Sequence, residues 1–177
     1  DAKVAAAVRR VIPQAAAAAE HAAAGIAKGG RLIYVGAGTS GRLGVLDASE
    51  CPPTFGVSYE TVQGHIAGGY GALIHAAEGA EDDAEAGIEL IDSLDVNADD
   101  TVIGISASGG ARYVIAAVKR AREKGAYTAA ITSNPNTPLG RAAETEIAAI
   151  TGAEAVAGST RMKCGTAQKM VLNMLST

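Results

Sequence analysis

Two short segments rich in glycine and hydroxyl side chains have the composition of phosphate-binding loops. They are residues 36–42 (GAGTSGR) and 106–110 (SASGG), and each stands between a β-branched run and a helical pattern. Glycine lets the backbone approach a ligand closely, and the free N–H groups at the start of a helix attract an anion. For the second segment taken alone, an ordinary strand-to-helix turn with a serine N-cap is an equally good explanation. Two such segments in one chain favour a phosphate site.

Dinucleotide binding is the main rival for the first segment, because Gly36, Gly38 and Gly41 have the Gly-x-Gly-x-x-Gly spacing. A dinucleotide loop also needs a ribose-binding carboxylate at the end of a strand about 20 residues further on. The carboxylate that follows here, Asp47, falls within an expected helix instead. The pattern therefore favours a sugar-phosphate loop over a dinucleotide loop, and it favours a purely structural glycine turn least.

Carboxylates that could act as acid and base gather in two places. Asp47 and Glu50 precede a Cys-Pro-Pro sequence, and Glu78, Glu81 and their acidic neighbours follow downstream. Most of the second group is expected to form a solvated helix face. Glu50 is harder to explain as a structural residue, because the helix dipole disfavours an anion at a helix C-terminus. General acid catalysis is one explanation, but the residues alone leave a structural role open for both Glu50 and Glu81.

A third candidate anion site precedes the last helical pattern. Ser159 and Thr160 stand at the expected helix N-terminus and are followed by Arg161 and Lys163. Basic side chains beside free helix N–H groups bind carboxylate or phosphate well. An N-cap with solvated basic side chains accounts for the same residues. The sequence leaves both interpretations open.

The order of the elements predicts an α/β fold that would position these segments. Strands are expected at 31–35, 61–67, 101–106, 127–132 and 146–151. Helices are expected at 2–28, kinked or split by Pro13, and then at 40–48, 70–92, 110–124, 137–143 and from 160. This alternation predicts a single domain over 1–177, with a parallel sheet covered by helices on both faces. Ligands bind such sheets outside the carboxyl ends of the strands.

The composition bounds the class of protein and its partners. Of the 177 residues 48% are hydrophobic, which is enough for a core, and the formal net charge is -4 without runs of like charge. We therefore expect neither nucleic acid nor a membrane surface as a partner. Cys51 and Cys164 form neither a disulfide framework nor a zinc pattern, which fits a reducing cytoplasm. Because the chain ends inside a helical pattern, we expect it to be a fragment of a longer protein.

Several segments resemble one known family. Residues 30–56, 66–69, 77–82 and 158–177 resemble the N-acetylmuramic acid 6-phosphate etherases of the sugar isomerase (SIS) domain superfamily, and DASECPPTFG and GSTRMKCGTAQKMVLNMLST are highly specific. The resemblance implies a five-stranded parallel sheet in a flavodoxin-like three-layer sandwich. It also implies a homodimer with shared active sites, further helical residues after this segment, and no metal or nucleotide cofactor.

The resemblance implies a reaction as well. The family splits the C3 ether of N-acetylmuramic acid 6-phosphate into N-acetylglucosamine 6-phosphate and D-lactate, by elimination and then addition of water. By family motif, Glu50 is the proton donor and Glu81 its acid/base partner. The residues expected to bind the substrate and its phosphate are Gly38, Thr39, Ser40, Ser106, Ser108, Gly109, Ser159, Thr160 and Lys163.

One departure from the family pattern bears on the substrate. Where the family usually reads Ser-Gly-Arg-Thr-Pro-Tyr-Val, residues 108–114 read SGGARYV, which removes the threonine hydroxyl and shifts the arginine. Glucokinase regulatory proteins resemble the same family, so a non-catalytic sugar-phosphate sensor is an alternative. An aldose–ketose sugar-phosphate isomerase, which also needs a base at C2, is another. The two glutamates favour the etherase, whereas the altered loop favours the sensor.

Overall fold

Five parallel strands form the predicted sheet. The computed structural model describes residues 1–177, and the strand order is β2-β1-β3-β4-β5. The strands are β1 (Leu32–Gly36), β2 (Val62–Ile66), β3 (Thr101–Ile105), β4 (Tyr127–Thr132) and β5 (Thr145–Ala148). Each lies within its expected segment or one residue outside it. The prediction of a five-stranded parallel sheet is therefore confirmed.

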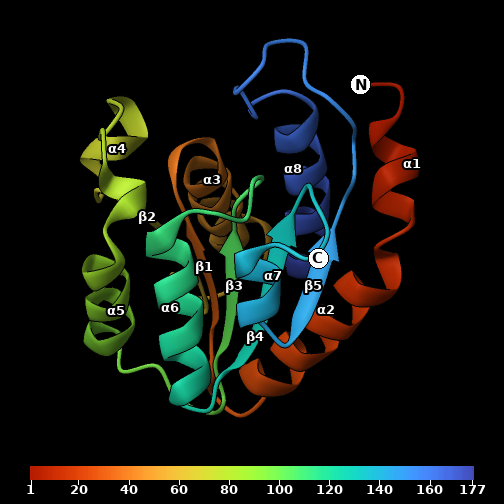
Figure 1. Cartoon of the computed structure of the whole chain (residues 1–177). Helices are drawn as coiled ribbons and strands as arrows, with labels where there is room; N and C mark the ends of the chain where they lie inside the picture. The colour runs from red at the N-terminus through yellow and green to blue at the C-terminus, as the bar shows by residue number, and fades with distance from the viewer.

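Helices cover both faces of this sheet, as Figure 1 shows. They are α1 (Val4–Arg9), α2 (Ile12–Ile26), α3 (Gly38–Phe55), α4 (Gly71–Ile74), α5 (Ala84–Ser93), α6 (Arg112–Glu123), α7 (Pro138–Ala142) and α8 (Lys163–Ser176). Helices α1, α2, α3 and α8 lie on one face, and α5, α6 and α7 lie on the other. None of the helices is both long and apolar enough to cross a lipid bilayer. The arrangement is the expected three-layer sandwich.

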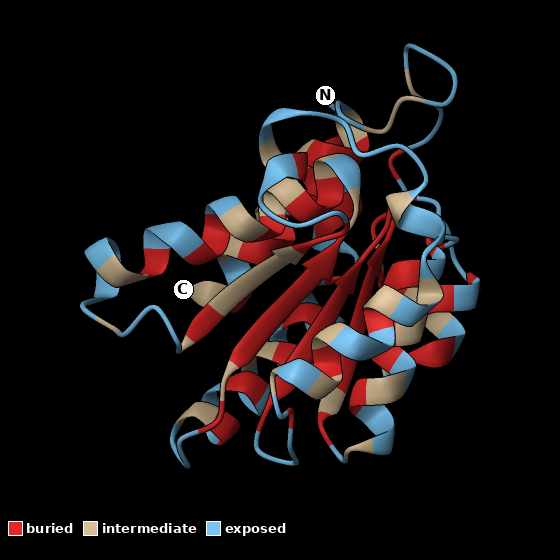
Figure 2. Cartoon of the chain, turned by 90° about the vertical axis from the view of Figure 1, so that its left-hand side faces the viewer, coloured by how far each residue is buried: buried red, intermediate tan, exposed pale blue.

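Each face of the sheet has its own hydrophobic core. Side chains alternate along a strand, so Leu32 and Tyr34 of β1 point to the layer of α2 and α8, whereas Ile33 and Val35 point to the layer of α6. All four side chains are at most 1% exposed. Figure 2 shows the strands buried between the two helical layers, with the exposed residues on the outer helix faces and in the loops.

Prolines shape two helices in different ways. Pro13 splits the first helical segment and lies in the first turn of α2, where a missing N–H group breaks no hydrogen bond. The helix expected at 40–48 continues to Phe55 and contains Pro52 and Pro53, so its expected end at residue 48 is wrong. It ends at Gly56, which adopts a left-handed φ of 69° and donates its N–H to the Pro52 carbonyl.

The continuous helix expected over 70–92 is also wrong. His75 is extended, and Gly79 has a φ of 74°, a left-handed conformation that an α-helix does not tolerate. The segment therefore divides into α4, a 3-10 helix at Ala80–Asp82, and α5. This division leaves Glu81 in the short 3-10 helix instead of on a continuous α-helix face.

An ion pair joins the amino ends of β1 and β3. The Asp100 carboxylate accepts hydrogen bonds from the Arg31 backbone N–H at 2.9 Å, from Arg31 Nε at 3.0 Å and from Arg31 Nη2 at 2.7 Å. It also accepts from the Asn97 N–H at 3.0 Å, and its side chain has no exposed surface. Burial by itself raises the pKa of Asp100, but the hydrogen bonds from Arg31 and Asn97 outweigh burial and hold that pKa below its ordinary value of 3.8.

We expect Asp100→Asn to lower the free energy of unfolding at neutral pH by about 3 kcal/mol, because the variant leaves the Arg31 guanidinium without its anion. The folded-state pKa of Asp100 is depressed, so its stabilisation is present above the unfolded-state pKa and is lost as the pH falls through the folded-state pKa. Urea unfolding between about pH 2 and pH 7 should show a smaller acid-induced loss in the variant than in the wild type. Equal losses would contradict this assignment.

Candidate active site

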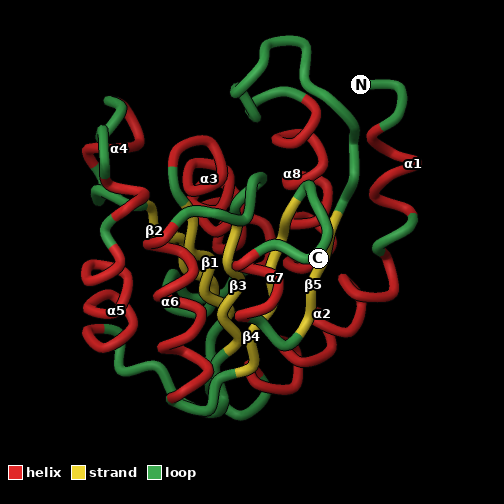
Figure 3. Tube along the Cα trace, in the orientation of Figure 1, coloured by secondary structure: helices red, strands yellow, loops and turns green.

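The carboxyl ends of the strands lie at one edge of the sheet, where the strand order reverses. From β1 the chain crosses to β2 on one side and later to β3 on the other side of β1. The crevice at such a reversal is the usual ligand site of open parallel sheets. The loops after β1 and β3 leave the sheet at this edge (Figure 3). These are the two segments that the sequence predicts to bind phosphate.

The loop after β1 contains two kinds of glycine. A Cβ on Gly36 would lie 2.6 Å from the Gly41 nitrogen, so this pair lets β1 and α3 approach each other closely. Gly38 instead has a φ of 54° and nothing within 4 Å of its Cβ position. Helix α3 begins at Gly38 and has no side-chain cap. The N–H groups of its first turn are therefore available to an anion.

A buried glutamine that the sequence analysis missed contacts the hydroxyls of this loop. Ser40 is buried, and its Oγ donates a hydrogen bond to Oε1 of Gln168 on α8 at 3.1 Å. The two residues are 128 positions apart. No local pattern links residues at this separation, so only the packing of α8 on α3 could reveal the contact.

The loop after β3 presents two serine hydroxyls. Ser106 Oγ accepts the Gly109 N–H at 3.1 Å, Ser108 Oγ accepts the Gly110 N–H at 3.2 Å, and the two oxygens lie 3.5 Å apart. One of the two hydroxyls can donate to the other, and the second hydroxyl still has a proton for an anion. The N-cap of α6 is Ala111, without a side-chain hydrogen bond, so a serine N-cap does not explain this loop.

Glu81 lies beside the first predicted phosphate loop. A hollow of about 200 Å³ is lined by Glu81 and Glu78 together with Gly38 and Arg42. The Arg42 guanidinium donates to the carbonyls of Leu73 and Ala72 at 3.0 and 2.7 Å and so ties the α4 segment to α3. The structure therefore joins Glu81 to the loop that contains Gly38.

Glu50 lies in a different hollow. Its cavity, of about 330 Å³, is between α3 and α8 and includes Asp47, Lys169 and Asn173. Glu50 is twelve residues after Gly38 on α3, which places it about 18 Å further along the helix axis. The hollow of Glu50 and the hollow of Glu81 have no lining residue in common.

The third predicted anion site is already occupied by a side chain of the protein. Helix α8 begins at Lys163, and the N–H groups of Lys163 and Cys164 donate to the Glu154 carboxylate at 3.2 and 2.9 Å. The hydrogen bond from the Cys164 backbone is the main cause of a lowered pKa of Glu154. Ser159 and Thr160 therefore do not cap α8, contrary to the N-cap interpretation.

One residue of that segment, Thr160, lies near the second predicted phosphate loop. The Lys163 ammonium donates a hydrogen bond to the carbonyl of Ala153. Thr160 lines a cavity of about 340 Å³ with Ser108, Ser133 and Cys164, beyond the ends of β3 and β4. Thr160 is thus close to a predicted phosphate loop, whereas Ser159 lines none of the hollows described.

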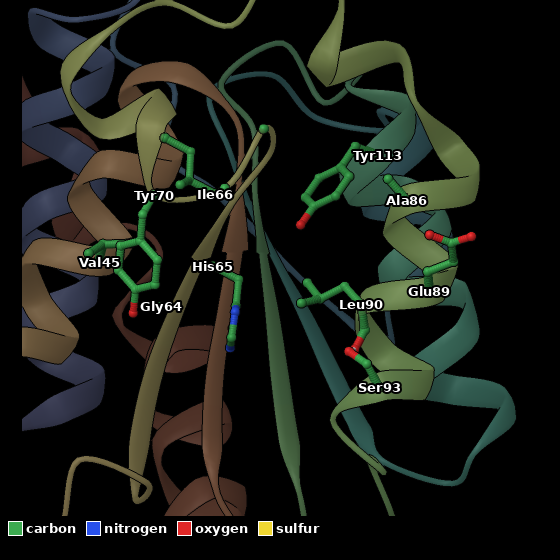
Figure 4. Close-up of a pocket in the computed structure, with 12 residues that line it drawn as sticks. Val45, Gly64, His65, Ile66, Tyr70, Ala86, Glu89, Leu90, Ser93 and Tyr113 are labelled. Carbon is green, nitrogen blue, oxygen red and sulfur yellow. The ribbon is translucent and has the colours of Figure 1, made fainter.

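Another large cavity lies elsewhere, beside the edge strand β2. It measures about 500 Å³, and Figure 4 shows His65, Tyr70 and Tyr113 around it. Burial lowers the pKa of His65, with Arg31 adding to this effect, and burial raises the pKa of Tyr113 to about 12. None of the predicted site residues lines this cavity. The candidate active site is therefore the edge where the loops converge.

The fold and this edge define a class of protein, namely open parallel α/β domains that bind an anionic ligand at the strand reversal. Residues 82–177 match the SIS domain model, and residues 14–122 match the model of the glucokinase regulatory protein N-terminal SIS domain. The chain belongs to the SIS domain family.

Curated relatives of high sequence identity cover the whole chain. The N-acetylmuramic acid 6-phosphate etherases of Cronobacter sakazakii and Yersinia pestis are 57% and 58% identical to it over all 177 residues. The chain spans 60% of the length of these relatives.

Solved structures share its fold. Phosphoheptose isomerase GmhA from Neisseria gonorrhoeae has a TM-score of 0.75 at 16% identity, covering 99% of this chain and 91% of that chain. The Vibrio vulnificus NanR protein, solved in complex with ManNAc-6P, has a TM-score of 0.61 at 15% identity, covering 93% and 52%.

We expect Gly109→Ala to disrupt the second loop. Gly109 has a φ of 69°, and a Cβ there would collide with the Thr137 side chain. The variant should lose about 2 kcal/mol of unfolding free energy and should bind a sugar phosphate more weakly in isothermal titration calorimetry. Gly110→Ala is the steric control, because the nearest atom to its Cβ would be Ser108 Oγ at 3.6 Å. Equal melting temperatures for the two variants would count against this loop geometry.

Proposed function

We propose that the full-length protein is an N-acetylmuramic acid 6-phosphate etherase of the cytoplasm. The observation that carries the proposal is the presence of Glu50 and Glu81 in a chain that is 57–58% identical over its whole length to such enzymes. The convergence of two hydroxyl-rich loops at the carboxyl edge is consistent with a sugar-phosphate substrate.

The chemistry requires one base and one acid. In the ring-opened sugar the C2 proton is acidic because it is next to the C1 aldehyde. A base removes this proton, the C3–O bond breaks, and an acid protonates the departing lactate oxygen. Water then adds at C3 of the unsaturated aldehyde while C2 regains a proton, which gives N-acetylglucosamine 6-phosphate. We assign proton donation to the lactate oxygen to Glu50 and the partner acid/base role to Glu81.

The phosphate would be held by the two loops at the strand reversal. Ser106 and Ser108 have hydroxyl protons to donate, and the first turn of α3 supplies N–H groups from Gly38 onward. Thr160 would approach the ligand from the third segment. Residues 110 and 111 are glycine and alanine where the family pattern has arginine and threonine. The loop therefore relies on serine and backbone donors, and we expect phosphate binding to depend strongly on Ser108.

We propose further that two copies of the protein share their active sites. Glu50 and Glu81 line separate hollows in one chain. Beside Glu50, the α3 and α8 surface exposes Leu46, Phe55 and Met174, at 53%, 48% and 40%. Apolar surface of this kind is typical of a contact between subunits. In a two-fold dimer, this surface of each subunit could cover the carboxyl edge of the other. Glu50 of one subunit would then lie near Glu81 of the other in both of the symmetric active sites.

The first test is release of D-lactate from N-acetylmuramic acid 6-phosphate by the full-length protein. We expect activity in the wild type and a loss of at least about 100-fold in both Glu50→Ala and Glu81→Ala. Glu85→Ala, an exposed carboxylate in the first turn of α5, is the matched control and should keep full activity. No lactate from a folded protein that still binds the sugar phosphate would support a sensor, and an interconverted sugar would support an isomerase.

Shared sites make a second prediction. Co-expression of Glu50→Ala and Glu81→Ala chains with different tags yields mixed dimers in which one of two sites has both glutamates. Random assembly should restore about a quarter of the wild-type activity from two inactive parents. Activity that stays at the level of the parents, while tandem affinity purification recovers mixed dimers, would place both glutamates in the same chain.

A further inference from the structure

Gln168 contains an unsatisfied hydrogen-bond donor in the interior of the protein. Its side chain, on α8, is 2% exposed, and Oε1 accepts the hydroxyl of Ser40 at 3.1 Å. The amide nitrogen Nε2 has no partner, although it is buried. A buried donor without an acceptor is costly. An unsatisfied group of this kind beside a ligand loop calls for a functional explanation.

The direction of this hydrogen bond decides what Ser40 can offer a ligand. A serine hydroxyl has one proton, and in this structure that proton is directed at Gln168. Phosphate oxygens accept hydrogen bonds, so Ser40 in this state has no proton to donate to them. A half-turn of the Gln168 amide would put Nε2 against Ser40 Oγ. The nitrogen would then have an acceptor, the amide oxygen would give up its donor, and the serine proton would be free for the ligand.

We propose that Gln168 is the positioning residue of the first phosphate loop: when the phosphate binds, its amide turns and donates to Ser40 Oγ, so that Ser40 donates its proton to the phosphate. This inference rests on the proposed sugar-phosphate ligand. It assigns Gln168 a role in binding, through Ser40, without contact to the reacting carbons.

Other contacts hold α8 in place without Gln168. Asp47 on α3 accepts hydrogen bonds from Asn173 Nδ2 at 2.6 Å and from Ser176 Oγ at 3.3 Å, both on α8. Val171 and Leu172 of α8 also lie in the same buried hydrophobic core as Ala48 of α3. Contacts other than Gln168 thus hold α8 against α3. Removing the Gln168 amide should leave the packing in place and affect mainly the hydroxyl of Ser40.

The test is a double-mutant cycle in the full-length protein. Gln168→Met keeps the length of the side chain and removes the amide. We expect it to weaken binding of N-acetylglucosamine 6-phosphate about 5- to 10-fold by calorimetry, to raise KM for lactate release by the same factor, and to leave kcat within about twofold. In a Ser40→Ala background the same substitution should have no further effect on binding.

Two additional variants guard against loss of folding. Gln168→Glu keeps an acceptor and removes the donor, so it should retain the serine proton and bind the sugar phosphate more weakly than Gln168→Met. Thr166→Val, on the same helix but hydrogen-bonded only to the Met162 carbonyl, is the control for a general change in α8. Its affinity should equal that of the wild type.

An NMR measurement distinguishes a turn of the Gln168 amide from a general change in packing. The side-chain amide signal of Gln168, identified by its absence in Gln168→Met, should shift when sugar phosphate is added to the wild type and stay unchanged in Ser40→Ala. An equal loss of affinity in both backgrounds of the cycle would overturn the proposal. Because the cycle measures binding, a wild type that binds the sugar phosphate but releases no lactate would reject only the etherase assignment. A wild type that does not bind the sugar phosphate would reject both the etherase assignment and the role of Gln168.

Discussion

The close approach of α3 to the end of β1 fixes the geometry of the carboxyl edge. Gly36 and Gly41 touch where a side chain on either would collide with backbone or with Ile66. This contact directs the first turn of α3 at the strand reversal, where its N–H groups face the crevice. The loop after β3 lies opposite, because β3 is the other neighbour of β1. The relative position of the loops after β1 and β3 therefore depends on the close packing of Gly36 and Gly41, which themselves need not touch a ligand.

The same helix also separates the two proposed catalytic carboxylates. Helix α3 continues through two prolines to Phe55, so Glu50 lies about three turns beyond the start of the helix, where Gly38 stands. Glu81 stays near that start, because the division of 70–92 leaves it in a short 3-10 helix that lines a hollow with Gly38. Within one chain the two carboxylates therefore line separate hollows. This constraint makes a second subunit the simplest way to complete a site with both.

Helix α8 connects the parts of this arrangement through polar contacts. Glu154 caps its N-terminus, Gln168 holds the Ser40 hydroxyl, and Asp47 accepts from Asn173 near the Glu50 hollow. The Glu154 carboxylate thus occupies the first N–H groups of α8, which an external anion would otherwise use. Binding at the edge instead depends on how α8 presents its buried amide to the first loop.

The sequence by itself determined the strands, their alternation with helices that makes the sheet parallel, and the two loops rich in glycine and hydroxyl residues. It could do so because β-branched runs and turn residues encode local conformation. Family motifs singled out Glu50 and Glu81 as the proposed catalytic pair. The tertiary structure alone decided that these glutamates lie apart, that Glu154 fills the α8 N-terminus, and that Gln168 meets Ser40 across 128 positions. Such contacts depend on the packing of distant helices, which no local periodicity specifies.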